Sequence, residues 1–172
     1  MTNREIRNKN SFTWLPIQEV GKLFAGIFIT IIPLVAILKA GNNGVLSSII
    51  DIVVDSSGNP VNIMYFWITG VLSGFLDNAP TYLVFFNLAG SNAPENILMA
   101  EFLMNHTPQT LMAISAGAVF MGALTYIGNA PNFMVQSIAE ENNVKMPSFI
   151  GYMLWSILIL GPIFFILSII IF

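Results

Sequence analysis

The chain has 172 residues, of which 55% are hydrophobic and only 9% charged, and its formal net charge is -3. A mean hydropathy of +0.76 leaves too little polar surface to cover a soluble globule, so the composition predicts a membrane protein. With no cysteine, one histidine and six basic residues, the sequence excludes a disulfide framework, thiolate or histidine-rich metal sites, and a basic face for nucleic acid.

The amino-terminal part of the chain predicts a tail, one membrane span and a loop. Residues 1–19 are polar and charged, which predicts a cytoplasmic tail, and residues 20–40 offer roughly the 20 residues that a helix needs to cross a bilayer. Residues 41–62 contain clusters of Asn, Ser, Gly and Pro that indicate loop structure, with an apolar stretch between them that is too short to span. The basic residues near the start favour a cytoplasmic amino terminus.

Three apolar regions remain. The first is interrupted and can be a hairpin or a span, the second is an interrupted span, and the third is a continuous span. Residues 63–90 are broken at residues 77–80 into halves too short to cross alone, so they form either a re-entrant hairpin or one long tilted span. After a polar connection, residues 109–139 form a span broken at residues 128–131, and residues 149–172 form a last span with a kink at Gly161-Pro162. The chain has too few basic residues to decide on which side of the membrane the last two loops lie.

Both breaks contain the same tripeptide. Asn78-Ala79-Pro80 and Asn129-Ala130-Pro131 lie within ten-residue segments, 75–84 and 126–135, that match in aromatic, aliphatic and polar character. Proline removes a backbone donor and clashes with the preceding turn, so each copy is expected to interrupt its helix and to leave unpaired backbone groups at membrane depth. A single such motif is commonly only a kink, but two matched copies predict two halves of one site.

The residues of the breaks have the chemistry of an ion site. A buried Asp costs roughly 2.5–3.5 kcal/mol at membrane depth, so Asp77 requires water, a cation or a proton. Asn78 and Asn129 offer amide oxygens to a cation and amide protons to a carboxylate, and Pro80 and Pro131 suit the first position of the following half-helix. Further neutral oxygen ligands are expected from Thr81, Asn132 and Thr125.

Other small and aromatic residues have structural interpretations. Glycines in the apolar regions are expected to allow close helix packing, namely Gly70, Gly74, Gly117 and Gly122. Four aromatic residues are expected to anchor helices at the membrane interface, namely Phe66, Trp67, Tyr152 and Trp155.

With these motifs, residues 74–81 and 125–132 resemble the citrate transporter or sodium:proton antiporter family of the ion transporter superfamily, and the resemblance covers most of residues 20–172. It implies an all-α, polytopic membrane protein with a re-entrant helical hairpin, whose tip is residues 77–81, and a discontinuous transmembrane helix that unwinds at residues 128–132. It favours the hairpin over the full crossing. It also implies that the chain is one repeat, the carboxy-terminal half, of an inverted-repeat transporter.

The resulting prediction is an ion-coupled secondary transporter, most simply a sodium:proton antiporter, because Asp77 stands where many dicarboxylate symporters have Ser. The predicted sodium ligands are Asp77, Asn78 and Asn129. The whole predicted ion or substrate site comprises the two break segments, namely Asp77, Asn78, Ala79, Pro80, Thr81, Gly128, Asn129, Ala130, Pro131 and Asn132.

Two alternatives stay open, a sodium-coupled citrate or dicarboxylate transporter and a non-transporting membrane scaffold or truncated fragment. An enzyme is not expected, because no Ser/His, paired-Asp or His-rich metal arrangement is present. No cofactor is expected besides Na⁺ or H⁺ as coupling ion. The expected partners are the lipid bilayer, the coupling ion, citrate or another small carboxylate, and a missing amino-terminal repeat or a second copy of the chain. The expected location is the bacterial inner membrane, as a multi-pass protein.

Overall fold

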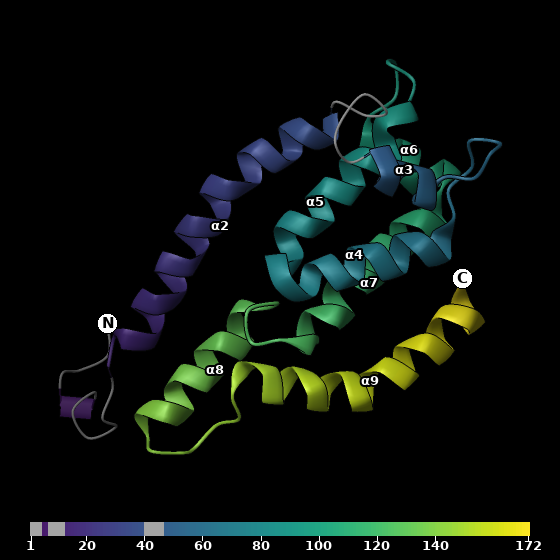
Figure 1. Ribbon diagram of the computed structural model, residues 1–172. Helices are drawn as coiled ribbons and strands as arrows, with labels where there is room; N and C mark the ends of the chain where they lie inside the picture. The colour runs from purple at the N-terminus through teal and green to yellow at the C-terminus, as the bar shows by residue number, and fades with distance from the viewer. Residues whose placement is uncertain (1–4, 7–12, 40–46) are drawn as a thin grey trace.

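The computed structural model describes residues 5–6, 13–39 and 47–172 (Figure 1). Within these residues the fold is all-helical, as the sequence predicts, and the only strand-like pairing is a single bridge between Val54 and Pro60. The elements in chain order are α2 (Leu15–Lys39), α3 (Ser47–Val53), α4 (Asn62–Leu76), α5 (Asn78–Ala89), η2 (Gly90–Asn92), α6 (Met99–His106), α7 (Pro108–Met121), η3 (Gly122–Leu124), α8 (Ala130–Glu141) and α9 (Phe149–Ile171).

Helix α2 takes the place of the first predicted span but begins earlier, so residues 15–19 of the predicted tail are helical. Most of that tail, residues 1–4 and 7–12, and the start of the following loop, residues 40–46, lie outside the described residues. The loop itself contains the short helix α3. After it, the Asp55 carboxylate accepts hydrogen bonds from the Asn59 and Ser57 amides, both at 2.8 Å, and these hold the pKa of Asp55 below its usual value.

Helices α4 and α5 form a helical hairpin that turns at one residue, Asp77 (Figure 1). The first break is therefore shorter than the predicted residues 77–80, because α5 already begins at Asn78. Pro80 is the third residue of α5 and not the first. It still lies in the first turn, where no backbone amide has a partner within the helix, so its missing N–H costs nothing.

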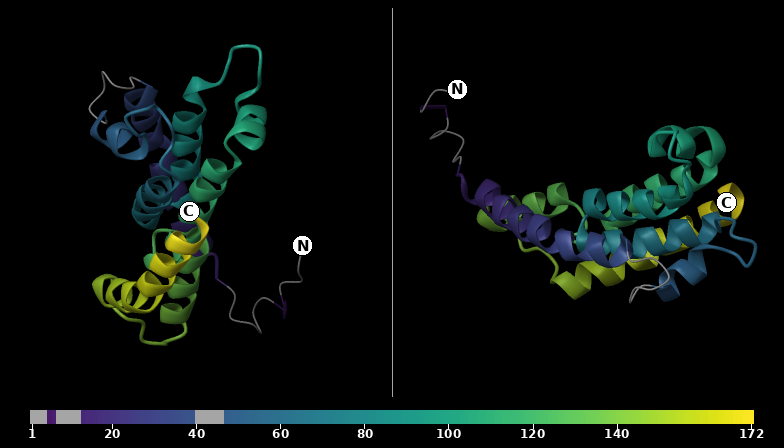
Figure 2. Two further views of the ribbon diagram at one scale, coloured as in Figure 1. Left: turned by 90° about the vertical axis from the view of Figure 1, so that its right-hand side faces the viewer. Right: turned by 90° about the horizontal axis from the view of Figure 1, so that it is seen from above.

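The second break is longer than predicted. Helix α7 continues into the 3₁₀ turn η3, the chain is then non-helical over residues 125–129, and α8 begins at Ala130 with Pro131 as its second residue. At its other end α7 follows α6 at a bend of 105°. Figure 2 shows α6 projecting at one end of the molecule.

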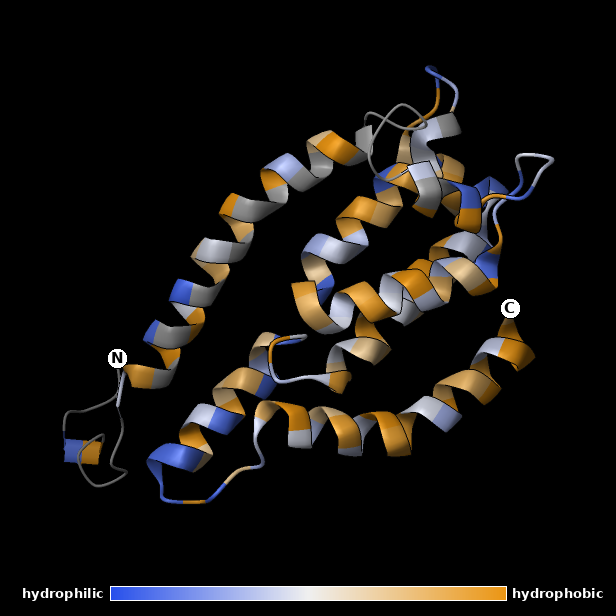
Figure 3. Ribbon diagram, viewed as in Figure 1, coloured by the Kyte–Doolittle hydropathy of each residue, from blue (hydrophilic) through white to orange (hydrophobic). Residues whose placement is uncertain are grey.

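Helix α9 is, in the described part of the chain, the one helix long and apolar enough to cross a bilayer by itself, and the bent pair of α6 with α7 and η3 is a second candidate. Figure 3 shows α9 to be hydrophobic along its length, with polar residues gathered in the loop before it. Its inward face carries Ser156, Phe164 and Ser168, which are buried at helical spacing, while most of its other apolar side chains are exposed. Such a surface is typical of a helix that contacts lipid.

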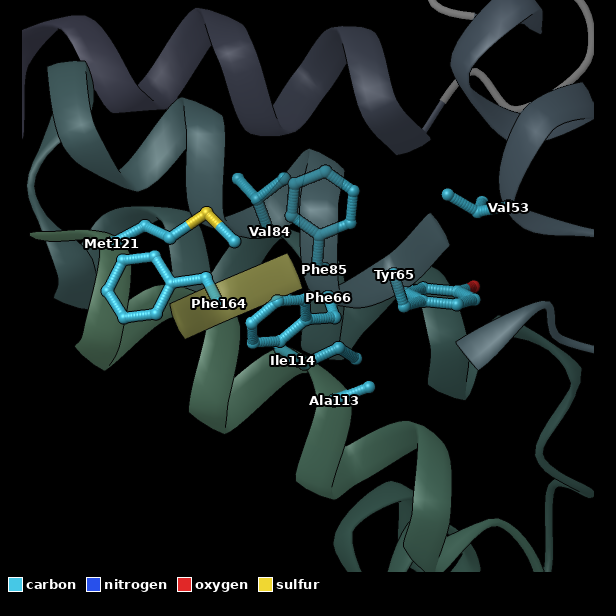
Figure 4. Close-up of a cluster of buried hydrophobic side chains, with 9 residues drawn as sticks. All are labelled: Val53, Tyr65, Phe66, Val84, Phe85, Ala113, Ile114, Met121 and Phe164. Carbon is cyan, nitrogen blue, oxygen red and sulfur yellow. The ribbon is translucent and has the colours of Figure 1, made fainter. Parts of the chain in front are cut away.

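The core lies where α4 packs against α7. Nine buried side chains from α3, α4, α5, α7 and α9 meet there (Figure 4). The helices approach closely because both contribute glycines: a Cβ on Gly117 would lie 2.3 Å from the Phe66 carbonyl oxygen, and one on Gly70 would lie 2.2 Å from the Met121 sulfur. The expectation of close packing is confirmed for Gly70, Gly117 and Gly122, whereas a Cβ on Gly74 would meet nothing closer than 3.4 Å.

Three of the four predicted interfacial aromatics have other roles. Phe66 is 1% exposed within the core, and Trp67 donates from Nε1 to the Ser168 hydroxyl at 3.1 Å, joining α4 to α9. Tyr152 contacts the second break, as described below. Trp155 is 64% exposed, as an anchor at the interface would be.

Candidate functional site

The first break places a carboxylate in a buried, strained position. Asp77 is 3% exposed and has φ 74° and ψ 153°, a region that residues with a side chain rarely occupy. Its Oδ1 accepts a hydrogen bond from the Ala79 amide at 3.4 Å, so the side chain caps α5. Its Oδ2 is buried and has no hydrogen-bond partner within the described residues. One carboxylate oxygen is therefore free to take a proton or a cation.

Thr81 stabilises this turn from one helical turn further on. Its hydroxyl donates to the Asp77 carbonyl oxygen at 2.8 Å, and Thr81 is itself 2% exposed. This bond ties the first turn of α5 to the residue at which the hairpin turns. The Thr81 oxygen, predicted as an ion ligand, thus has a structural role at the tip of the hairpin.

The second break is held by two polar side chains. The Thr125 hydroxyl accepts from the Gly128 amide at 2.9 Å and donates to the Gly74 carbonyl oxygen, which belongs to the last turns of α4. The Asn132 side-chain nitrogen, Nδ2, donates to the Gly122 and Thr125 carbonyl oxygens, both at 3.2 Å. These bonds replace the backbone bonds that the break removes, and they explain why the unwound segment extends back to Thr125.

The second break packs against the end of α4 at three glycines. A Cβ on Gly128 would lie 2.7 Å from the Gly122 carbonyl oxygen and 2.9 Å from the Gly74 Cα. Together with the hydrogen bond from Thr125 to Gly74, this contact packs the second break against α4 three residues before Asp77. A side chain does not fit at position 128 without a shift, because the three atoms nearest to its Cβ are all backbone.

Helix α9 binds η3, the turn just before the second break. The Tyr152 hydroxyl donates to the Ala123 carbonyl oxygen at 3.1 Å, and the Ser156 hydroxyl donates to the Leu124 carbonyl oxygen at 2.6 Å. The Tyr152 ring stacks on that of Tyr126 with 4.2 Å between centroids. Sequence reasoning missed Ser156, and only its isolation in an otherwise apolar helix could have indicated it.

The two copies of the tripeptide both lie at helix amino termini, but each helix begins at a different residue of the tripeptide. Asn78 is the first residue of α5, whereas Asn129 precedes the first residue of α8. Both asparagines are half-buried, and neither side chain makes a hydrogen bond to another described residue. Their amides are therefore available to a ligand.

The remaining predicted site residues have different surroundings. Pro80 and Gly128 are buried, Ala130 is half-buried, and Ala79 and Pro131 are exposed. Among the described residues no group of three or more His, Cys, Asp or Glu side chains could hold a metal ion, so Asp77 does not belong to such a cluster. A cation here would be held by one carboxylate together with amide and backbone oxygens, a donor set of the kind that Na⁺ meets at interrupted helices.

A buried acid at a helix interruption, in a chain with an apolar spanning helix, is typical of membrane transporters. The chain belongs to the family described as "Putative citrate transport", whose sequence model matches residues 1–172, the whole chain. The match extends over the polar start, which the resemblance of the motifs did not cover. The protein is thus a membrane protein of a transport family. Comparison with curated proteins and with solved structures gives no match.

Proposed function

We propose that the protein is an ion-coupled secondary transporter in which Asp77 binds Na⁺ and H⁺ in turn, so that sodium is exchanged for protons. The observation that carries the proposal is the buried Asp77 Oδ2, which has no partner in the described structure. An ionised carboxylate left in this state is strongly unfavourable, and a bound cation or proton removes the penalty. A single acid that takes either ion, but not both, is the simplest basis for exchange.

The charge of Asp77 supports a cation over an anion at this tip. A citrate carboxylate about 4 Å from Asp77 would be repelled by about 4 kcal/mol at an effective dielectric constant of 20. The tip of the hairpin thus favours Na⁺ or H⁺, with Asn78 and Asn129 as additional oxygen ligands.

The alternative is sodium-coupled transport of citrate or a related carboxylate, which the family description favours. The amino terminus of α8 has no side-chain cap. Pro131 has no N–H and the Asn132 backbone amide donates to the Asn129 carbonyl oxygen at 3.0 Å, so a carboxylate could be received by the Ala130 backbone amide and the Asn129 side-chain amide. In this alternative Na⁺ occupies Asp77 and the anion lies at α8, which gives the two breaks separate ligands.

We further propose that α4 and α5 form a re-entrant hairpin and that α7 and α8 form one broken span of a multi-pass protein in the bacterial inner membrane. The hairpin is supported by its length, because arms of 15 and 12 residues reach only about 22 and 18 Å at 1.5 Å per residue. The missing half of the site would come from an amino-terminal repeat or from a second copy in the opposite orientation.

The test is ion flux through vesicles that contain the full chain, alone and together with any separately encoded first repeat. We expect a sodium gradient to drive proton movement, and Asp77→Asn to abolish it because the amide neither ionises nor binds a proton. Asp51→Asn, which changes an exposed acid on α3, is the matched control and should leave flux unchanged. Full flux in the Asp77 variant would remove Asp77 from the mechanism.

The same vesicles distinguish the alternatives. Uptake of labelled citrate that depends on a sodium gradient, without sodium-driven proton movement, would favour the carboxylate transporter. Absence of all flux in every combination would favour the scaffold.

A further inference from the structure

One face of α8 carries polar side chains that lead from the protein surface to the second break. We call them the oxygen row and define it as Asn132, Gln136 and Glu140. These residues lie four apart within α8, so they share one face of the helix and follow one another at about 6 Å per step. Glu140 is exposed, whereas Gln136 and Asn132 are half-buried, and Figure 3 shows polar residues at this end of α8 and in the loop that follows. The oxygen row therefore begins in water and runs about 12 Å inward.

The amide donors of the oxygen row are bonded within the protein, and its free atoms are oxygens. The Asn132 side-chain nitrogen donates to the Gly122 and Thr125 carbonyl oxygens, as described above. The Gln136 side-chain nitrogen donates to Glu140 Oε1 at 3.0 Å. Asn132 Oδ1, Gln136 Oε1 and Glu140 Oε2 accept no hydrogen bond from another described residue. Amide and carboxylate oxygens are the ligands of hard cations, so the chemistry of the oxygen row suits a cation and not an anion.

The other side of α8 is apolar. Ile138 is 44% exposed and, two residues after Gln136, is turned about 200° from it around the helix axis. Glu141, about 100° beyond Glu140, accepts a hydrogen bond from the Thr13 hydroxyl just before α2, so α2 begins beside a different face from the oxygen row. At membrane depth an exposed apolar face contacts lipid, whereas polar side chains face protein or a water-filled cavity. This arrangement predicts water along the oxygen row.

The inner end of the oxygen row is bonded to both ends of the second break. The Asn132 side chain donates to the Thr125 carbonyl oxygen, and its backbone amide donates to the Asn129 carbonyl oxygen at 3.0 Å. Helix α8 contains no basic residue that would repel a cation on the way. The oxygen row thus ends directly at residues 125–129.

We propose that the oxygen row lines a water-filled approach through which a small monovalent cation passes between the surface at Glu140 and the second break. The Glu140 carboxylate attracts the cation, and the side-chain oxygens of Gln136 and Asn132 replace part of its hydration shell as it moves inward. The inference rests on the proposed function, in which the breaks bind Na⁺, and it adds the route by which the ion reaches them.

The first experiment measures access from water without requiring transport. The chain has no native cysteine, so Gln136→Cys and Ile138→Cys each place a single thiol on α8 of the full chain in lipid vesicles. A small, positively charged thiol reagent should modify Gln136→Cys and spare Ile138→Cys, because a thiol in lipid does not ionise. Exposure in the structure alone would give the opposite order, since Ile138 is the more exposed side chain. Equal rates, or faster modification of Ile138→Cys, would overturn the proposal.

The same thiol tests the preference for cations. A negatively charged reagent of equal size should modify Gln136→Cys about tenfold more slowly than the positive one, the ratio expected from one unit charge about 6 Å away in water. Adding Glu140→Gln should remove this preference and leave the thiol accessible. Equal rates for the two reagents with Glu140 intact would contradict a cation path.

Ion flux separates the path from the proposed function and does not depend on the cysteine variants. Gln136→Leu should raise the sodium concentration for half-maximal flux about tenfold, the effect of losing one polar contact to a charged group, whereas the control Ile138→Leu should leave it unchanged. An unchanged value in Gln136→Leu would contradict the path. Cation-selective modification of Gln136→Cys without any flux would keep the path and remove the proposed function, and Asp77-dependent flux with an inaccessible Gln136→Cys would do the reverse.

Discussion

Asp77 combines three properties at one residue: a positive φ, burial, and a carboxylate that both caps α5 and keeps one oxygen free. Its backbone conformation, φ 74° with ψ 153°, is one that glycine adopts readily and other residues do not. A glycine would turn the hairpin with less strain but would have no ligand. The residue is thus better suited to a function than to stability.

The strained backbone of Asp77 predicts that its replacement by glycine or alanine affects stability differently, although either replacement abolishes transport. Asp77→Gly should be more stable than Asp77→Ala by about 1–3 kcal/mol, because both lack the carboxylate and only alanine keeps the strained Cβ. Both should be inactive. Thermal unfolding in detergent measures the difference, and an alanine variant as stable as the glycine variant would show that the turn is not strained.

The contact between the second break and α4 gives a second prediction at single residues. Gly128→Ala should destabilise the protein by about 1–3 kcal/mol and impair transport, because its Cβ would meet three backbone atoms within 3 Å. Gly74→Ala should instead stabilise it by about 0.5–1 kcal/mol, since alanine favours the helix and its Cβ would meet nothing closer than 3.4 Å. Denaturant unfolding of both variants compares them directly, and similar losses in both would contradict the packing described here.

At the scale of elements, the contact of α9 with the segment around the second break can be tested by removing the hydroxyl of either of two tyrosines. The Tyr152 hydroxyl bonds to the Ala123 carbonyl beside the break, whereas the Tyr126 hydroxyl bonds to the Pro147 carbonyl in the loop before α9, also at 3.1 Å. Tyr152→Phe should cost about 1 kcal/mol and speed hydrogen exchange of the amides at residues 125–129. Tyr126→Phe keeps the stacked rings and should leave that exchange unchanged. Equal exchange in both variants would show that Tyr152 does not hold the break.

The positions of the two breaks could be predicted from sequence because their causes are local. Asn-Ala-Pro disfavours a continuing helix, and an acid in an apolar run marks a place where the chain must be polar. The all-helical fold followed from composition and apolar run lengths, and the family followed from the same motifs.

The extent of the breaks and their supports could not be predicted, because their causes lie in other elements. Thr125 bonds to Gly74, a residue 51 positions away, and this bond helps to unwind the chain before Gly128. The first break is one residue long, and not four as predicted, because the Asp77 side chain itself caps α5. Pairings of this kind depend on which helices become neighbours, and a single sequence does not contain that information in a readable form.

For the whole molecule, the exposed apolar surface of α9 predicts its environment. Leu158 lies near the middle of α9 and is 67% exposed, and Leu98 lies just before α6 and is 76% exposed. Leu158→Arg should weaken membrane insertion of this segment by roughly 2.5–3.5 kcal/mol, whereas Leu98→Arg should not. Glycosylation-tagged insertion or alkaline extraction distinguishes them. Normal integration of the Leu158 variant would contradict the assignment of α9 as a lipid-facing span.

The two serine contacts of α9 restrict how the molecule can change shape. Ser156 fastens the helix to η3 and Ser168 fastens it to α4, twelve positions or about 18 Å apart along its axis. A helix held at two points this far apart cannot slide along α4 and η3 without breaking one of the two hydrogen bonds. In the proposed transport cycle, the movement that exposes the ion alternately to the two aqueous compartments should therefore carry α4, η3 and the attached parts of α9 together.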